Sequence, residues 1–554
     1  MKRKDVGTAF ITRVDYPNKG RFTIEETGEQ GIVKNTIPGQ TVRFRVYKKH
    51  GGLIYGNRLE VTEPSPLETR APLCDNFGLC GGCLYQTMPY ASQLEMKVEQ
   101  MQRLLSDVLS EDTLFDGIKA SPHELEYRNK LDLSFGDAVA GGPLTLGMHK
   151  MATRYTVLDA DSCVLAHPDL RAILKEVRAF CAEEKLPHYN KLSHIGFLRY
   201  LMLRRSETSG EILMVLAASS QMEVDFSPLV DRLLALPLAG SFAGIFHAVD
   251  DRYADALIAD EVRCLYGRDY FYESLLGLRF KVTLFSFFQT NTKGAEVLYD
   301  TVRSYVRQSR AETAGEKPVL YDLYCGTGTI AQIMAEESSR VYGIELVEEA
   351  VEAARRNAEL NGLTNCTFLS GDVFETLPQI PEKPDYVILD PPREGVHEKA
   401  LRKILDYGIS DMVYISCKAS SFAEDMRYLK KQGWKIQRYT LVDMFPETQH
   451  IETVCLLSKL SGAKHHVSIT LDMEEMDLTA AESKATYQEI QEWVQEKYGF
   501  HVSHLNIAKT KRKCGIIERK NYNLPKSEDS WSPETPKEKE EAIREAFKYF
   551  QMID

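Results

Sequence analysis

Apolar and polar residues alternate in short segments over the first 60 residues of the chain. In residues 41–47 every second side chain is apolar and the intervening positions include Arg43 and Arg45, the period of a strand with one buried face. Residues 8–11 and 21–24 have the same character, and Pro or Gly turn signals separate the segments. We therefore expect residues 1–62 to form a small β-barrel of the OB type with a cationic outer face.

The periodicity changes after a Pro-rich joint at residues 63–66. Helical patterns cover residues 87–110, 168–184 and 227–235, whereas strand patterns cover residues 128–135 and 211–216. This mixture predicts an α+β central domain over residues 70–285.

Strand and helix patterns alternate from about residue 286 to residue 462, as in a parallel, doubly wound sheet. We expect an α/β, Rossmann-like domain there. Residues 463–554 are rich in Lys and Glu, with helical patterns at 480–497 and 536–550 and a basic stretch at 509–513. They predict a small helical C-terminal extension.

Composition and charge narrow the class of protein. The 554 residues are 43% apolar and 27% charged, ordinary values for a globular protein, and no apolar run approaches the ~18 residues of a membrane span. The formal net charge is −12, yet residues 1–60 carry 12 Lys and Arg against six Asp and Glu. Such asymmetry is compatible with a nucleic-acid partner. With eleven cysteines and no visible leader, we expect a cytoplasmic protein.

A glycine loop follows the apolar strand at residues 319–324. Gly326 and Gly328 let the backbone approach a ligand at the carboxyl end of that strand. Glu345 ends the next strand, where a carboxylate can accept both hydroxyls of a ribose, and Asp390 ends a later one. The loop lacks a Walker lysine and a third glycine, which disfavours ATP and NAD. S-adenosylmethionine fits the pattern.

Cys417 follows a further strand at residues 412–415 and would therefore lie beside the same crevice. Downstream, His450 and Glu452 would share one face of a strand. A cysteine, a carboxylate and a methyl donor are needed together for methylation at C5 of uracil, because that carbon becomes nucleophilic only after a thiolate adds to C6. An amino-group methyltransferase would need no thiolate.

A second cysteine group lies near the N-terminus. Cys74, Cys80 and Cys83 fall within ten residues on a Gly-rich loop, and Cys163 is the best candidate for a fourth ligand. The spacing alone leaves zinc and an iron–sulfur cluster open.

Five ordered motifs resemble the RNA uracil-C5 methyltransferase family, whose members modify ribosomal and transfer RNA. They are FFQTN at 287–291, DLYCGTG at 322–328, DPPREG at 390–395, YISC at 414–417 and FPETQHIE at 445–452. The resemblance covers about residues 1–460. It implies that residues 1–62 are an RNA-binding TRAM domain.

The resemblance also implies roles for individual residues. Cys417 would be the nucleophile and Glu452 the base that removes the C5 proton. Four residues would contact S-adenosylmethionine: Gln289, Tyr324, Glu345 and Asp390. A [4Fe-4S] cluster would be held by Cys74, Cys80, Cys83 and Cys163.

The chain departs from the family at two positions. It has Lys418-Ala419 where Asn-Pro usually follows the nucleophile, and Glu447 where His, Gln or Tyr is common. The first departure bears on how the loop after Cys417 is held.

The cysteine set favours 23S ribosomal RNA as the substrate, because the transfer-RNA branch commonly lacks the cluster. A transfer-RNA enzyme and a non-catalytic, redox-sensing iron–sulfur RNA-binding protein are the alternatives. An amino-group methyltransferase using the DPPREG loop is a third reading, although Arg393 stands where such enzymes usually have an aromatic residue. We expect a monomer with no membrane or protein partner.

Overall fold

The computed structural model describes residues 1–153, 155–253, 257, 259–313, 317–459, 487–498, 500, 502–514 and 536–549. The chain divides into two compact units, residues 1–462 and residues 463–554. Within the described residues, no helix is both long enough and apolar enough to cross a bilayer.

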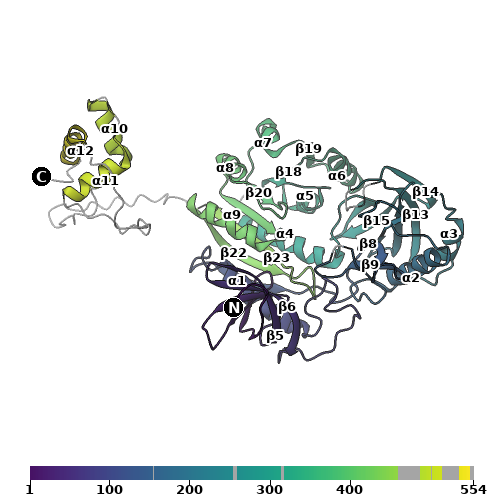
Figure 1. Cartoon of the computed structure of the whole chain (residues 1–554). Coiled ribbons are helices and arrows are strands. Elements are labelled where there is room, and N and C mark those ends of the chain that lie inside the picture. Colours follow the sequence, from purple (N-terminus) through teal and green to yellow (C-terminus); the bar gives the residue numbers. More distant parts are fainter. Residues whose placement is uncertain are drawn as a thin grey trace. The chain divides into compact units, whose positions relative to one another are not determined.

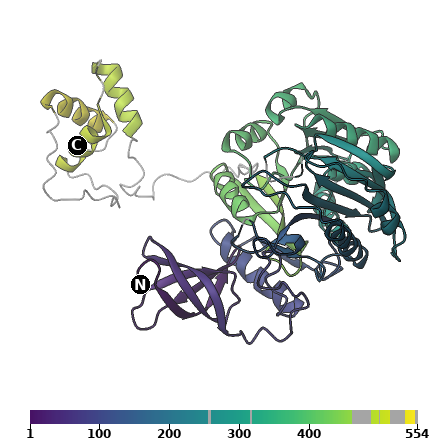
Figure 2. The same cartoon turned by 45° about the vertical axis from the view of Figure 1, so that its right-hand side comes forward.

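The first six strands form one sheet, called here the N-terminal sheet (Figures 1 and 2). Its order is β1-β5-β6-β4-β3-β2, and its strands are β1 (Val6–Phe10), β2 (Arg13–Asp15), β3 (Lys19–Thr23), β4 (Gln30–Lys34), β5 (Thr41–His50) and β6 (Leu53–Glu63). In β5 the apolar side chains Val42, Phe44 and Val46 are buried, while Arg43 and Arg45 point to solvent. The alternation therefore predicted both faces of this strand.

A seven-stranded sheet follows, in the order β10-β9-β8-β11-β12-β13-β14. Its strands are β8 (Lys130–Asp137), β9 (Leu144–His149), β10 (Val157–Asp159), β11 (Leu198–Arg205), β12 (Glu211–Ala218), β13 (Ser241–Val249) and β14 (Glu261–Gly267). Helices α2 (Pro168–Glu183) and α3 (Ser227–Leu234) share a core with one face. The other face joins the core of the hairpin β15 (Tyr270–Leu275) and β16 (Leu278–Thr283).

The largest sheet has eight strands in the order β19-β18-β17-β20-β21-β23-β22-β7. Its parallel part comprises β17 (Val319–Leu323), β18 (Arg340–Glu345), β19 (Cys366–Ser370), β20 (Tyr386–Leu389) and β21 (Asp411–Ser416). β23 (Glu452–Lys459) runs antiparallel to β21 and to β22 (Trp434–Val442). The alternating pattern predicted the parallel part of this α/β sheet, whereas the antiparallel direction of β23 was not predicted.

Helices cover both faces of this sheet because its strands are apolar on both sides. One face packs with α4 (Thr292–Thr313), α5 (Thr329–Met334) and α6 (Glu348–Leu360). The other packs with α1 (Tyr90–Leu105), α8 (Glu398–Asp406) and α9 (Ala419–Lys431). α7 (Val373–Thr376) lies after β19.

One strand of this sheet comes from far away in the sequence. β7 (Leu114–Lys119) pairs parallel to β22 at the sheet edge, and the preceding helix α1 shares a core with α9. The sequence pattern did not predict β7. The segment expected as a central domain thus supplies a strand and a helix to the sheet that carries the glycine loop.

The unit of residues 463–554 contains α10 (Tyr487–Tyr498), α11 (His504–Lys513) and α12 (Lys537–Tyr549). Ile490 and Val494 of α10, Ile507 of α11 and Phe547 of α12 are buried together in its core. The helix expected at 480–497 is described from residue 487, since residues 480–486 lie outside the described part. The basic stretch 509–513 falls within α11.

Candidate active site

The carboxyl ends of the parallel strands meet at one edge of the eight-stranded sheet. Leu323 of β17 is in register with Ile344 of β18 and with Leu389 of β20. The residues that follow these three positions are Tyr324, Glu345 and Asp390. The sheet register therefore brings three of the residues predicted to contact the cofactor to the same edge, where α/β sheets bind ligands.

The loop after β17 has positive φ angles at Tyr324 and Gly328, a conformation that few residue types adopt easily. Tyr324 has φ 65°, a left-handed conformation that is rare for an aromatic residue and typical of functional sites. Gly328 has φ 71°, and a Cβ there would lie 2.5 Å from the Phe368 ring and 2.8 Å from Cβ of Ala354. The glycine thus permits close packing of the loop against α6 and β19.

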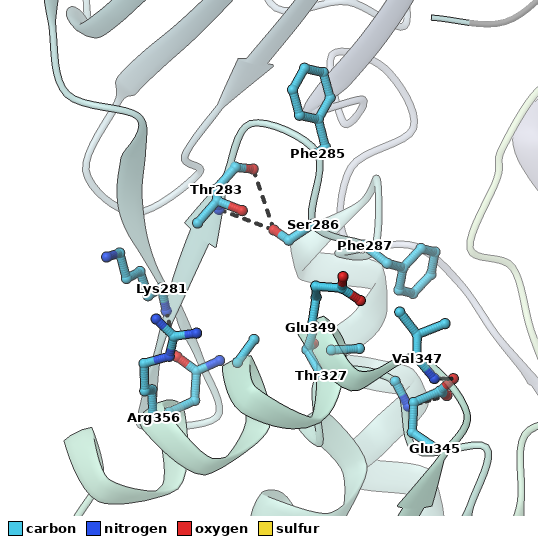
Figure 3. Close-up of a pocket in the computed structure, with 14 residues that line it drawn as sticks. Lys281, Thr283, Phe285, Ser286, Phe287, Thr327, Glu345, Val347, Glu349 and Arg356 are labelled. Atoms are coloured by element: carbon cyan, nitrogen blue, oxygen red, sulfur yellow. Dashed lines mark hydrogen bonds between the residues drawn. The ribbon is translucent and has the colours of Figure 1, made fainter. Parts of the chain in front are cut away.

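Glu345 is fixed by backbone N–H groups of this loop region. Its Oε2 accepts the N–H of Gly326 at 3.1 Å, and its Oε1 accepts the N–H of Val347 at 3.0 Å. It lines a cavity of about 610 Å³ with Thr327, Phe287 and Lys281 (Figure 3). The carboxylate is therefore pre-oriented in the lining of a cavity large enough for a nucleoside.

Cys417 and Glu452 are brought together by strand pairing. Ser416 of β21 is directly opposite Thr453 of β23 in an antiparallel ladder. Continuing this register by one residue places Cys417 opposite Glu452. Two groups that are distant in sequence thereby reach the same end of the sheet.

Both groups line a second cavity, of about 400 Å³, together with Gln289, Tyr324 and Asp390. This cavity shares Phe287, Gly326 and Thr327 with the one that Glu345 lines. The six residues predicted for catalysis and cofactor binding thus lie around two adjoining cavities at one sheet edge.

The cavity lined by Cys417 and Glu452 raises the pKa values of both residues and of Asp390. Burial and the nearby charge of Asp390 raise the pKa of Glu452 to about 8. Burial raises the pKa of Asp390 to about 7. Burial, Glu452 and Asp390 also raise the pKa of the Cys417 thiol, whereas the charge of the Arg393 guanidinium lowers it. Arg393 thus opposes the environment that disfavours the thiolate.

Arg393 is part of the DPPREG motif, but the sequence predicted no role for it at this site. Its position after Pro392, in a loop following β20, was the available signal. A guanidinium beside a cysteine is the arrangement that stabilises a thiolate.

Side chains from the N-terminal half hold the loop that precedes Glu452. Lys97 Nζ forms a buried ion pair with Asp443 Oδ1 at 2.7 Å, and the Tyr127 hydroxyl donates to the Pro446 carbonyl at 3.0 Å. The Glu447 carbonyl accepts the N–H of Leu84 at 2.7 Å. Glu447 itself is fully buried, with φ 68° and an ion pair to Arg70. The chain therefore uses Glu447 as a structural anchor.

The four cysteines predicted as ligands line one pocket of about 320 Å³. Four thiols are the complete donor set of a [4Fe-4S] cluster, and the Cβ position of Gly81 between them is open. No three His, Cys, Asp or Glu side chains of the described residues are grouped closely enough to hold a metal ion. The donor chemistry fits a cluster, whereas the side chains are not arranged around one.

Known proteins with similar sequences are RNA methyltransferases. A family model described as a methyltransferase domain matches residues 316–497. The chain is 41% identical over 444 residues to an uncharacterized RNA methyltransferase of Clostridium tetani, a match that covers 80% of this chain and 95% of that protein. It is 39% identical to an uncharacterized RNA methyltransferase of Clostridium acetobutylicum, with 83% and 99% covered.

A solved structure has the same fold over most of the chain. It is the tRNA (uracil-54, C5)-methyltransferase of Pyrococcus abyssi in complex with S-adenosyl-L-homocysteine, with a TM-score of 0.62 at 24% identity. The match covers 81% of this chain and all of that one. With relatives above 30% identity matched over nearly their whole length, the chain belongs to the family of S-adenosylmethionine-dependent RNA methyltransferases.

Proposed function

We propose that this enzyme methylates C5 of a uridine in 23S ribosomal RNA. The observation that carries the proposal is the placement of Cys417 and Glu452 at the same end of the β21–β23 ladder, in the cavity that Asp390 and Gln289 line. A methyltransferase acting on an amino group requires neither the thiol nor the buried base.

The two residues act in sequence on the pyrimidine ring. The Cys417 thiolate adds to C6, and the π electrons move to C5 as an enolate. C5 then takes the methyl group that S-adenosylmethionine supplies, with S-adenosylhomocysteine as the leaving product. Glu452 removes the C5 proton, the C5–C6 double bond re-forms, and the bond from C6 to sulfur breaks.

The cofactor would lie across the two adjoining cavities. Glu345 would accept the ribose hydroxyls, because its carboxylate is held at the strand end by two backbone N–H groups. Tyr324, Gln289 and Asp390 line the neighbouring wall toward Cys417. This arrangement would direct the reactive methyl group toward the base bound at Cys417.

The remaining domains would serve the RNA. The N-terminal sheet, residues 1–62, would be the TRAM domain, with Arg45 and Lys48 on its exposed face. Residues 70–285 would be the central domain, apart from α1 and β7, which join the sheet of the catalytic domain at residues 286–462. Residues 463–554 would be an accessory unit. A uridine must leave its stack to reach Cys417, so an unpaired or flipped nucleotide is the expected substrate form.

A [4Fe-4S] cluster on Cys74, Cys80, Cys83 and Cys163 would be structural, because no step above requires an electron. It supports ribosomal RNA over transfer RNA as the substrate. The Pyrococcus abyssi protein, a tRNA (uracil-54, C5)-methyltransferase, keeps a transfer-RNA substrate as the alternative.

Covalent trapping tests the proposal. Large-subunit ribosomal RNA transcribed with 5-fluorouridine should form a stable adduct with the enzyme and S-adenosylmethionine, because fluorine at C5 cannot leave as a proton. Cys417→Ala should form no adduct and no product. Cys325→Ala, which alters another cysteine of the same cavity, should still be trapped. Normal methylation by Cys417→Ala would refute the mechanism, and trapping with transfer RNA alone would reassign the substrate.

A further inference from the structure

The loop that carries Arg393 is folded against the helix that follows the nucleophile. This loop, residues 390–396, comes after β20, and its residues Asp390 and Arg393 line the same cavity as Cys417. α9 begins two residues after Cys417. The contact between loop and helix therefore determines where a carboxyl group and a guanidinium group lie relative to the thiol.

Ser421 of α9 holds the loop at Arg393 itself. Its hydroxyl donates to the Arg393 carbonyl at 2.8 Å. The loop turns at this point, because the N–H of Gly395 donates to the Pro392 carbonyl at 2.9 Å. Ser421 is buried, so water competes little for its hydrogen bond. The backbone of Arg393 is thus attached to the first turn of the helix.

Asp425 holds the same loop one turn further along α9. Its Oδ2 accepts the N–H of Val396 at 2.9 Å and the Tyr414 hydroxyl at 2.5 Å. Tyr414 belongs to β21 and lies three residues before Cys417. One carboxylate oxygen therefore joins the loop to both elements that flank the nucleophile.

The loop approaches α9 so closely that it requires a glycine. Gly395 has φ 83°, and a Cβ there would lie 2.8 Å from Oδ2 of Asp425 and 3.2 Å from Cβ of Ser421. None of these contacts involves Lys418 or Ala419, the positions at which the chain departs from the family motif. The loop and the helix are thus held together by side chains beyond that departure.

Several titratable groups surround the thiol. Burial raises the pKa of the Cys417 thiol, as do the charges of Glu452 on β23 and of Asp390, whereas the charge of Arg393 lowers it. Tyr16, which follows β2, remains uncharged at neutral pH because burial raises its pKa to about 12. Arg393 is the cation of this group, so displacement of its loop would reduce the thiolate fraction of Cys417.

We propose that Ser421 and Asp425 are positioning residues for the methylation reaction, because they hold the loop that places Arg393 in the cavity of Cys417. The inference rests on the proposed role of Cys417 as the nucleophile. α9 would then serve the reaction in two ways, since it follows the nucleophile directly and also fixes the cation.

A double-mutant cycle between Ser421→Ala and Arg393→Gln tests the inference. The first measurement is the rate of Cys417 alkylation by iodoacetamide as a function of pH, without RNA, followed by mass spectrometry of the peptide that contains Cys417. The second is the rate of adduct formation with 5-fluorouridine ribosomal RNA at saturating RNA and cofactor. The melting temperature is recorded for each variant.

Arg393→Gln should raise the pH midpoint of Cys417 alkylation by about 1 unit, the effect of losing a nearby opposite charge. Ser421→Ala should raise it by about 0.5 unit, and should raise it no further in the Arg393→Gln background, because the group that it positions is already absent. Adduct formation by Ser421→Ala should be about threefold slower at neutral pH and should approach the wild-type rate at high pH, where the thiol is ionised in both proteins.

Two substitutions at Asp425 separate its hydrogen bonds from its charge. Asp425→Asn keeps an acceptor oxygen for Val396 and Tyr414 and should retain the wild-type midpoint. Asp425→Leu loses both hydrogen bonds and should raise the midpoint as Ser421→Ala does. Ser420→Ala, the same change at the neighbouring position of α9, is the matched control and should leave the midpoint unchanged.

Equal shifts caused by Ser421→Ala in both backgrounds would overturn the inference, as would wild-type midpoints in both Ser421→Ala and Asp425→Leu. Adduct formation slowed by the same factor at every pH would also contradict it, because that result indicates general damage to the fold. Absence of trapping by the wild-type enzyme, with the alkylation midpoints shifted as expected, would instead refute the proposed function.

Discussion

At the scale of single residues, the catalytic cavity is a poor environment for negative charge. Burial raises the pKa values of Glu452 and Asp390 above their ordinary range, and it also raises the pKa of the Cys417 thiol. A raised pKa suits a base that must take a proton from carbon, because it increases the strength of the base. Arg393 opposes this shift, because its charge lowers the pKa of the Cys417 thiol.

This environment predicts the pH dependence of the elimination step. As the proposed base, Glu452 would accept the C5 proton only when it is deprotonated. The rate should therefore increase as pH rises toward about 8, the pKa to which burial raises the residue, and level off above it. Release of tritium from C5 of labelled uridine RNA measures this step directly.

Glu452→Gln should abolish tritium release at every pH and accumulate the methylated covalent adduct on natural uridine. A variant that released tritium with an unaltered pH profile would assign the base to another residue.

At the scale of elements, the loop between β22 and β23 is held by side chains from the N-terminal half of the chain. Lys97 and Asp443 are 1% and 0% exposed, and among the described residues Asp443 Oδ2 has no hydrogen-bond partner. Because a buried charge is costly without its counter-ion, the ion pair holds the start of this loop against α1.

Removing one member of the Lys97–Asp443 pair should strongly destabilise the protein. Lys97→Met leaves Asp443 buried without its partner, so we expect the free energy of unfolding in urea to fall by about 3–5 kcal/mol. Adding Asp443→Leu should restore part of the loss, because both charges are then absent. Lys130→Met breaks the more exposed pair with Asp132 and should cost about 0–1 kcal/mol. Equal losses for Lys97→Met and Lys130→Met would contradict the argument.

The loop that carries Cys74, Cys80 and Cys83 is connected to the loop between β22 and β23. The N–H groups of Leu84 and Tyr85, which follow Cys83, donate to the Glu447 carbonyl. Enzyme purified without oxygen should be brown and contain about four irons and four sulfides per chain. Cys83→Ser should lose the colour and much of the protein in soluble form, whereas Cys181→Ser, which changes a buried cysteine of α2, should lose neither. A colourless protein with one zinc would replace the cluster by a zinc site.

Sequence periodicity was sufficient for the elements that depend on local pattern. Periodicity predicted the alternation in β5 and the strands β17, β18, β20 and β21. It also predicted that Glu345 and Asp390 lie at one sheet edge, because parallel strands end at the same edge. The placement of Cys417 near Glu452 depends on the antiparallel register of β23, which the periodicity did not predict. The motif resemblance implied only that both residues belong to one site. β7 was not predictable, because a six-residue edge strand is defined by its partner β22.

At the scale of the whole molecule, positive charge is available at both ends of the chain. Arg45 and Lys48 are exposed on β5, whereas Arg43 and Lys49 are paired with Glu60 and Glu29. The unit of residues 463–554 carries a second basic segment in α11. The two surfaces can be separated by mutation, because the second unit has its own core.

The salt dependence of RNA binding distinguishes the basic surface on β5 from the basic segment in α11. Arg45→Glu with Lys48→Glu should weaken RNA binding and reduce the slope of log K against log salt by about 0.7 for each phosphate that is no longer neutralised. Cofactor binding should be unaffected. Truncation after residue 462 should leave the slope nearly unchanged. The opposite result, a flatter slope only for the truncated protein, would assign the main RNA-binding surface to the C-terminal unit.

The pairing of β7 with β22 has a consequence for how the protein is made and cut. A ribosome releases residues 114–119 long before residues 434–442, so this strand must remain without its neighbour while about three hundred residues are synthesised, tens of seconds at bacterial rates. A fragment starting at residue 286 would keep the whole glycine loop yet expose the backbone of β22 as an open edge, which favours aggregation. A shortened enzyme for structural work therefore has to begin before α1.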